Sequence, residues 1–327
     1  MILGDFPMKN YKLTMLTCFG SYLTQAAVIN FLPLLFITFH DSFGIPLQQI
    51  TLLVTVNFLV QLTVDLLAAL YIDRVGYRVG AVGSQVFCAL GMILLSFLPD
   101  MMPSPFTGLL ISVIVYSIGA GLIEVLISPI VESTPADNKE TAMSLLHSFY
   151  CWGHMTMIIG STIFFVLIGI EHWQILAILW ALVPLTNAFF LSKVPMKPLL
   201  PDHMASATIR ELLSKKIFYL MLVYMVCAGS AELTVSQWSS AFAEEGLGVS
   251  KTVGDLAGPL FFALMMGIAR VAYSRLGEKI PLHRFMFFSA ILCLACYLTI
   301  ALSPIPAVSL FACGICGFSV GIFWPGT

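Results

Sequence analysis

Four ionisable side chains lie inside long apolar stretches of this sequence: Asp65, Glu124, Glu232 and Arg270. An ionisable group at the centre of a bilayer costs at least about 2.5–3.5 kcal/mol, so it usually faces a cavity or a partner. Glu124 precedes Ser128 by one helical turn, which places both on one face of a helix. A carboxyl group shielded from water can take up and release a proton near neutral pH, which is the chemistry of a proton relay. The alternative for Glu124 is a permanently protonated or ion-paired structural group.

A second group with binding chemistry begins at Glu232. Gln237 and Trp238 follow it within two helical turns and add an amide and a large ring. These three side chains are suited to a polyhydroxylated ligand such as a sugar, because they can hydrogen-bond hydroxyls and stack on an apolar ring face. The alternative is that Glu232 makes a hydrogen bond that packs two helices together.

Asn57, Gln61 and Asp65 recur every four residues and form one polar stripe on a helix. Such a stripe can line a binding site, but polar side chains within membrane helices more often hydrogen-bond a neighbouring helix. We therefore interpret the stripe as interhelical contacts.

Two patterns resemble metal sites. His147 and His154 share one face of a helix with Cys151, but no acidic residue is near them in sequence, and we expect hydrogen bonds toward a cavity. The cysteine pairs within 293–296 and 313–316 match a zinc template in spacing. Both pairs lie in apolar stretches, where four thiolates around zinc would leave a doubly negative centre in hydrocarbon. We therefore predict no metal site.

The elements that hold these residues are membrane-spanning helices. Of the 327 residues 59% are apolar and 10% charged, and the mean hydropathy is +0.97, whereas soluble domains carry about 25% charged residues. This composition excludes a soluble or disordered chain, and the net charge of -2 excludes a nucleic-acid binder. A β-barrel would need short strands of alternating polarity. Ten apolar runs are long enough to span a bilayer, at 12–39, 49–71, 79–98, 106–130, 141–169, 173–192, 217–243, 255–275, 284–303 and from 306 onward.

Basic residues predict the orientation of these spans. Thirteen of the 15 Lys and Arg residues fall in segments on one side, and the exceptions are Lys251 and Arg270. Because cytoplasmic loops are enriched in Lys and Arg, the N-terminus is predicted to be cytoplasmic. The first run is too long for a secretory signal. Translation can begin at Met1 or at Met8, and the sequence does not distinguish the two.

A proline-containing stretch at 193–216 divides the ten runs. Six runs precede it and four follow, so we predict an N-terminal six-helix half (1–192), a cytoplasmic linker (193–216) and a C-terminal half (217–327). The DRVG segment at Asp73 recurs as SRLG at Ser274, about 200 residues later, and a Gly-to-Pro spacing recurs with a similar offset. Counterparts of the fifth and sixth helices would fall near 340–395, so we expect ten spans of a twelve-helix design.

The segment from Ala69 to Arg78 resembles the helix two–three loop signature of the major facilitator superfamily, G-x-x-x-D-R-x-G-R-R/K. It departs at Ala69, where the family has Gly, and at Tyr77, where it has a basic residue. Within the superfamily the chain resembles the fucose-permease-like sugar transporters. The matching segments are Gly121 to Glu124 with Ser128-Pro129, His147 to Gly153, Gly229 to Glu232 with Trp238, and Phe323 to Pro325.

The resemblance implies roles for individual residues. In the fucose-permease-like family, the helix-four acid that matches Glu124 is implicated in sugar binding and proton coupling. Those symporters also carry an acid in helix one, whereas the first run here has Gln25 and Asn30. Either Glu232 substitutes for that acid, or transport is not coupled to protons. The expected substrate- and proton-binding residues are therefore Glu124, Glu232, Asn30, Gln25, Gln237, Trp238, His147 and Trp324.

The resemblance also implies a conformational gate. Asp73, Arg74 and Gly76 occupy signature positions that, in the family, form a network with neighbouring helix ends and latch the outward-facing state. Arg275 resembles their second-half partner. The alternative is that Asp73 and Arg74 are solvated charges at a cytoplasmic turn.

The function implied is secondary active transport of a monosaccharide-sized solute across the cytoplasmic membrane, by alternating access and together with a proton. A proton-coupled drug or metabolite efflux carrier of the same fold is the alternative, but the G-P-x-x-G signature typical of helix five in such carriers is absent. An intramembrane enzyme or a non-transporting sensor has less support, because the sequence lacks the H-E-x-x-H and Walker A motifs. We expect a monomer in the lipid bilayer without cofactor.

Overall fold

The computed structural model describes residues 9–135, 139–196, 213–276 and 280–323, and every regular element among them is a helix. Nine helices in these ranges are long and apolar enough to span a membrane, and Pro306–Val320 is a shorter apolar helix. Each coincides with one of the ten apolar runs predicted from the sequence. The prediction of an all-α polytopic membrane protein is therefore confirmed.

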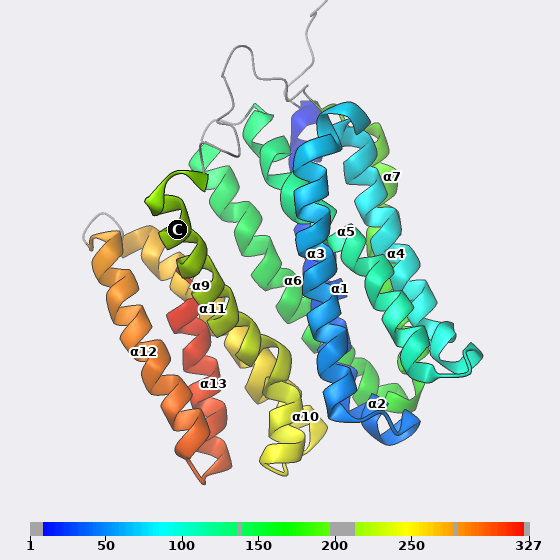
Figure 1. Ribbon diagram of the computed structural model, residues 1–327, viewed down its shortest axis with the longest axis vertical. Coiled ribbons are helices and arrows are strands. Elements are labelled where there is room, and N and C mark those ends of the chain that lie inside the picture. Colours follow the sequence, from blue (N-terminus) through cyan, green and yellow to red (C-terminus); the bar gives the residue numbers. More distant parts are fainter. Residues whose placement is uncertain (1–8, 136–138, 197–212, 277–279, 324–327) are drawn as a thin grey trace, which may run out of the picture. The chain divides into compact units, whose positions relative to one another are not determined.

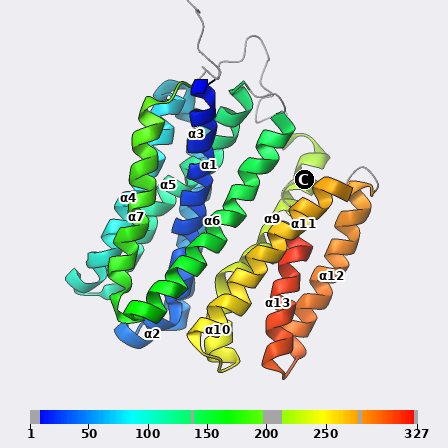
Figure 2. The same cartoon turned by 180° about the vertical axis from the view of Figure 1, so that it is seen from behind.

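The chain folds into two compact units, which are described separately: unit 1 (Met1–Leu200) and unit 2 (Pro201–Thr327). Unit 1 contains α1 (Lys9–Phe31), η1 (Leu32–Leu35), α2 (Phe36–Phe43), α3 (Leu47–Val75), α4 (Tyr77–Met101), α5 (Pro105–Ser133), α6 (Lys139–Ile168), η2 (Ile170–His172) and α7 (Trp173–Lys193). Unit 2 contains α9 (Lys216–Ala241), η3 (Phe242–Gly246), α10 (Lys251–Asp255), η4 (Leu256–Leu260), α11 (Phe261–Leu276), α12 (Leu282–Leu302) and α13 (Pro306–Val320). Figures 1 and 2 show both units from opposite sides.

Proline changes the helix type at two positions. At Pro33 the first span continues through the 3-10 helix η1, and at Pro259 the chain passes through η4, a π-helical turn. Proline lacks a backbone N–H and crowds the preceding turn, which explains both departures from regular α-helix. The first span consequently reaches Phe43, four residues beyond the predicted end.

Close helix packing organises unit 1. α4 packs most extensively on α5 and then on α7, while α1 lies along α6 and α3 lies along α5 (Figures 1 and 2). Small residues permit this approach: a Cβ at Gly153 of α6 would stand 2.8 Å from the Cα of Leu23 on α1. In unit 2, α13 packs on α11 and α12, and it also contacts α9.

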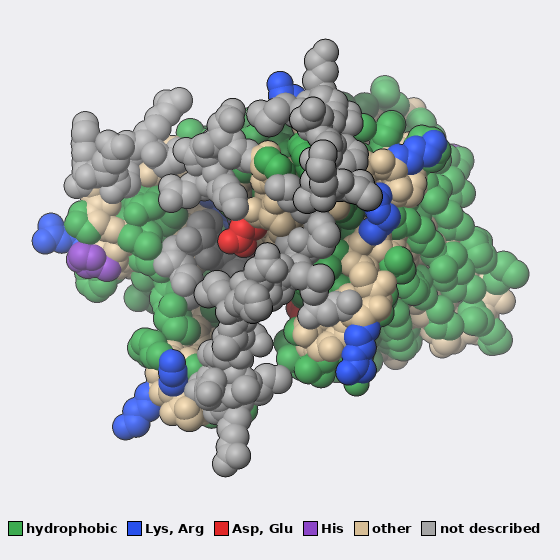
Figure 3. Space-filling model, turned by 90° about the horizontal axis from the view of Figure 1, so that it is seen from above, with side chains coloured by type: hydrophobic (Ala, Val, Ile, Leu, Met, Phe, Trp, Pro, Cys, Tyr) green, Lys and Arg blue, Asp and Glu red, His purple; other side chains and the backbone are tan. Residues whose placement is uncertain are grey.

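The helices expose apolar faces, as expected of a protein in lipid. On α3, Leu59, Leu62, Leu66 and Leu70 recur at helical spacing and are each more than half exposed, whereas Leu53 on the opposite face is buried. Lys and Arg side chains are visible at the end of the molecule shown in Figure 3. A helix with an apolar exposed face and a buried polar face positions its polar groups inside the bundle.

Candidate functional site

Glu124 and Gln25 meet where α5 passes α1. The Gln25 amide Nε2 donates a hydrogen bond of 2.5 Å to Glu124 Oε2, and it lies 3.4 Å from the carbonyl oxygen of Ala120. Gln25 is 2% exposed, so its amide is fixed by its surroundings. A hydrogen bond to an ionised carboxylate is about twice as strong as one between neutral groups. The structure thus brings together two of the side chains predicted from the sequence to bind substrate or proton.

A second contact between the same helices lies one turn away. The Tyr22 hydroxyl and Ser128 Oγ are 2.9 Å apart, and the Tyr22 ring contacts His147 of α6 edge-on, with ring centroids at 5.4 Å. Tyr22 is not among the residues predicted from the sequence, although it precedes Gln25 by three residues and therefore shares its face. We call Tyr22, Gln25, Glu124, Ser128 and His147 the α1–α5–α6 cluster.

Glu124 is the exposed member of this cluster. Its side chain is accessible, whereas Ile123 and Leu126 beside it on α5 are fully buried. One carboxylate oxygen is held by Gln25, and the group as a whole remains reachable. An accessible carboxyl group with a fixed neighbour can bind a proton or accept a hydrogen bond from a ligand hydroxyl.

Asn30 lies further along α1 and contacts a different partner. Its Nδ2 donates to the Ala26 carbonyl oxygen at 2.9 Å and to the Tyr150 hydroxyl at 3.2 Å. The second bond joins α1 to α6. His154 is buried beside the Tyr150 ring, at a centroid distance of 6.4 Å. These residues stabilise the α1–α6 packing on which the cluster depends.

The predicted residues of unit 2 lie on α9. Glu232 and Gln237 are buried, at 6% and 3% exposure, and Trp238 is half-buried. Both polar side chains of α9 are therefore shielded from solvent. Trp324 lies outside the described residues.

Unit 2 also holds an ionic cluster that the sequence patterns do not predict. Lys251 Nζ lies 3.2 Å from Glu244 Oε1 and 2.9 Å from Asp255 Oδ1, and Ser240 Oγ donates to Asp255 Oδ1 at 2.5 Å. Asp255 is fully buried. In the sequence, the four-residue spacing from Lys251 to Asp255 is the one feature that indicates an ion pair on a helix. Hydropathy, however, places Lys251 in an outside loop and Asp255 at the edge of a span.

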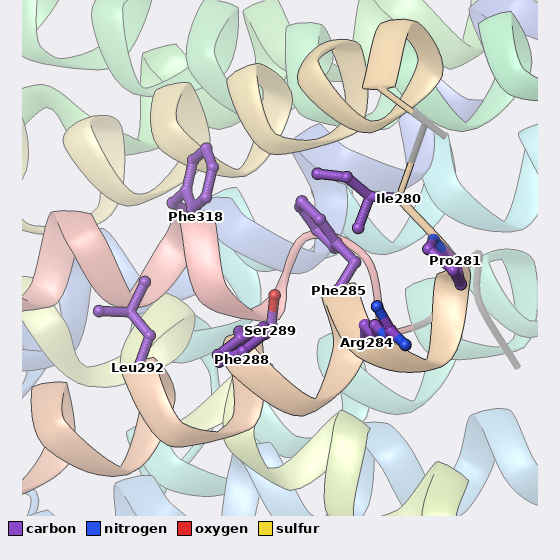
Figure 4. A pocket seen from close by; sticks show the side chains of 8 residues that line it. All are labelled: Ile280, Pro281, Arg284, Phe285, Phe288, Ser289, Leu292 and Phe318. Carbon is purple, nitrogen blue, oxygen red and sulfur yellow. The ribbon is translucent and has the colours of Figure 1, made fainter. Parts of the chain in front are cut away.

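Two cavities open within unit 2. The larger, of about 500 Å³, lies between α9 and α12 and is lined in part by Tyr224, Ser230, Thr234 and Tyr297. The smaller, of about 300 Å³, is lined in part by Arg284 and by the rings of Phe285, Phe288 and Phe318 (Figure 4). Neither is lined by Glu232, Gln237 or Trp238.

The predicted gate begins at the turn between α3 and α4. Gly76 is the single residue between these helices and has a φ of 93°, a conformation that favours glycine. Arg74 is exposed in the last turn of α3. The side chains of Asp73 and Arg275 lie outside the described residues. Arg78 of the same signature donates from Nη1 to the carbonyl oxygens of Leu191 and Ser192, at 3.2 and 3.0 Å.

Arg78→Ala should destabilise the packing of α4 on α7. A cation at a helix C-terminus satisfies carbonyl groups and opposes the helix dipole, a contribution of about 1 kcal/mol at a partly exposed site. The measurement is the thermal unfolding midpoint of the purified protein. Arg284→Ala, which removes an exposed Arg from the first turn of α12, is the control. Equal midpoints for the two variants would contradict the capping role.

An apolar helical bundle that holds polar and acidic side chains between its helices has the architecture of a multi-pass membrane protein with groups that can bind an ion or a polar ligand. The Major Facilitator Superfamily model matches residues 14–327. The chain belongs to this family, so the family and fold expected from the Ala69–Arg78 signature are confirmed, and the protein is a transporter rather than an enzyme.

Solved structures share the fold at low sequence identity. A D-xylose–proton symporter has a TM-score of 0.74 at 12% identity, with 96% of this chain and 80% of that chain covered. The E. coli fucose:proton symporter has a TM-score of 0.69 at 16% identity, with coverage of 97% and 83%. A POT family transporter in complex with 5-aminolevulinic acid has a TM-score of 0.68 at 14% identity, with coverage of 100% and 84%. No significant match was found among curated protein sequences.

Proposed function

We propose that this transporter imports a monosaccharide-sized solute together with a proton across the cytoplasmic membrane. The observation that carries the proposal is the contact between Gln25 and Glu124, which holds an accessible carboxyl group inside an apolar helical bundle. Placing an ionisable side chain inside a membrane-spanning bundle costs free energy, and such side chains typically bind an ion or a substrate. The neighbouring Tyr22 and Ser128 hydroxyls add donors and acceptors for a polar ligand.

The sugar assignment is supported by chemistry and by similarity. Hydroxyl, amide and carboxyl groups of the α1–α5–α6 cluster match the hydroxyls of a monosaccharide, and we propose Glu232, Gln237, Trp238 and Trp324 as the substrate-binding residues of unit 2. Two of the solved structures with this fold are named as symporters of D-xylose and of fucose with protons. We propose that the two halves, 1–192 and 217–327, alternate in access around this substrate, with Asp73, Arg74, Gly76 and Arg275 as the gate.

The proposed topology places the N-terminus and the 193–216 linker in the cytoplasm. The enrichment of Lys and Arg in segments on one side supports this orientation. We propose that the transporter acts as a monomer in the lipid bilayer.

The test is uptake of radiolabelled D-xylose and fucose by cells that produce the full chain, with and without a protonophore. Uptake of at least one sugar should exceed that of empty-vector cells several-fold and fall to the vector level when the proton gradient is collapsed. A membrane-inserted protein that takes up neither sugar would overturn the assignment to these sugars. Sugar uptake that is unchanged by the protonophore would overturn the proposed proton coupling.

A further inference from the structure

The polar stripe of α3 divides into two parts in the structure. Asn57 Oδ1 accepts hydrogen bonds from Ser117 Oγ of α5 at 2.7 Å and from Gln61 Nε2 at 3.1 Å. Asn57 and Gln61 are buried, and Asn57 makes through Ser117 the interhelical contact that the sequence predicts. Asp65, one turn further along the stripe, takes no part in this contact: its Oδ1 is buried and has no hydrogen-bond partner among the residues that the structure describes. A buried carboxylate oxygen without a donor is costly, so Asp65 requires another explanation.

Asp65 lies where α3 packs against Gly121 of α5, one helical turn before Glu124. A Cβ at Gly121 of α5 would stand 3.1 Å from the Cα of Gln61 and 3.2 Å from Asp65 Oδ1. Glu124 follows Gly121 by three residues and therefore lies on the adjoining turn of the same helix. The absence of a side chain at Gly121 thus brings a second carboxyl group to the α1–α5–α6 cluster.

No other charged group on α3, or on the helices described as packing on it, accounts for Asp65. α3 packs on α5, α4 and α2. The remaining acidic, basic and histidine residues on α3 and on these helices stand near helix ends: Asp73 and Arg74 on α3, His40 and Asp41 on α2, Arg78 and Asp100 on α4, and Glu132 on α5. Arg78 is bonded to the end of α7. Among the charged residues of these helices, only Glu124 lies on the turn that adjoins the Gly121–Asp65 contact, and it is an acid.

We propose that Asp65 and Glu124 form a coupled carboxyl pair that binds and releases the transported proton, with Asp65 serving as the second acid that α1 lacks. Two neighbouring carboxylates resist being ionised together, so the pair retains one proton more readily than either group alone. Accessible Glu124 exchanges the proton with its surroundings, and Asp65 with its buried Oδ1 shares it. The inference rests on the proposed proton-coupled function and names the residue that completes its proton site.

The transport test uses purified full-length protein in liposomes, with labelled D-xylose and fucose as probes. At a membrane potential of 100 mV, Asp65→Asn should reduce proton-driven accumulation from about fortyfold to near unity, while sugar counterflow stays within about twofold of wild type. The double variant Asp65→Asn/Glu124→Gln should accumulate no less than either single variant, because coupled groups act as one unit. Asp65→Glu should restore part of the accumulation.

Asp100→Asn makes the same chemical change at the far end of α4 and should leave accumulation unchanged. Wild-type accumulation by Asp65→Asn would overturn the pair. Loss of accumulation together with loss of counterflow, not restored by Asp65→Glu, would assign Asp65 a structural role and also overturn it.

A readout without sugar separates the proton site from the substrate assignment. Infrared difference spectra of the purified protein in lipid, recorded between acidic and alkaline pH, report the C=O stretch of protonated carboxyl groups. We expect the same band to be altered by Asp65→Asn and by Glu124→Gln and unaltered by Asp100→Asn. If neither sugar is transported but both variants alter the band, the sugar assignment fails and the pair stands. A band altered by Glu124→Gln alone would overturn the pair.

Discussion

Glu124→Gln is expected to abolish proton-driven accumulation while leaving sugar exchange across the membrane. One elementary charge moved through 100 mV is worth about 2.3 kcal/mol, which corresponds to about fortyfold accumulation of a solute that moves with one proton. Glutamine keeps the shape of the side chain and an oxygen that can accept from Gln25 Nε2, so the α1–α5 contact persists. The charge and the exchangeable proton are lost. The concentration ratio should therefore fall toward unity without loss of fold.

The measurement compares accumulation and counterflow of the same labelled sugar in liposomes of defined potential. Glu132→Gln is the matched control, because Glu132 is an exposed residue in the last turn of the same helix. It should accumulate sugar as the wild type does. If Glu124→Gln accumulated sugar to the wild-type ratio, the proposed proton coupling through this residue would be wrong. If it lost counterflow as well, Glu124 would be primarily a substrate ligand.

The fold and part of the site could be predicted because they depend on local chemistry. Long apolar runs must be helical in lipid, whatever surrounds them, and the one-turn spacing of Glu124 and Ser128 places them on one face. The contact of Gln25 with Glu124 could not be predicted in this way, because the two residues are 99 positions apart. Periodicity identifies the face of a helix that is polar, but the neighbouring helix decides which residues meet on it.

Asp65 and the ionic cluster of unit 2 illustrate the same limit. The spacing of Asn57, Gln61 and Asp65 predicts a single feature, yet only its first two members hydrogen-bond to one another. In unit 2, hydropathy places Asp255 at the edge of a span and Lys251 in a loop. In the structure both residues lie between two π-helical turns and form an ion pair. A hydropathy window does not detect such turns.

Gly91→Ala is expected to destabilise the protein, whereas Gly83→Ala on the same helix is not. A Cβ at Gly91 would stand 2.5 Å from both the backbone nitrogen and the Cβ of Tyr116, in the extensive α4–α5 interface. Tyr116 is buried and its backbone belongs to α5, so α4 would have to move away. Overpacking of this kind costs about 1–3 kcal/mol. At Gly83 nothing lies within 4 Å of the added Cβ, and Ala favours a helix over Gly by about 0.5–1 kcal/mol.

These two glycines cannot be told apart by composition or hydropathy, since both lie in the apolar interior of α4 eight residues apart. The prediction therefore depends on the helix packing alone. Thermal unfolding midpoints of the purified variants decide it: Gly91→Ala should unfold several degrees below wild type, at roughly 2–4 °C per kcal/mol, and Gly83→Ala at or above it. A Gly91→Ala variant as stable as Gly83→Ala would show that α4 and α5 are further apart than the structure places them. The relation of α5 to its neighbours, and with it the placement of Glu124, would then need revision.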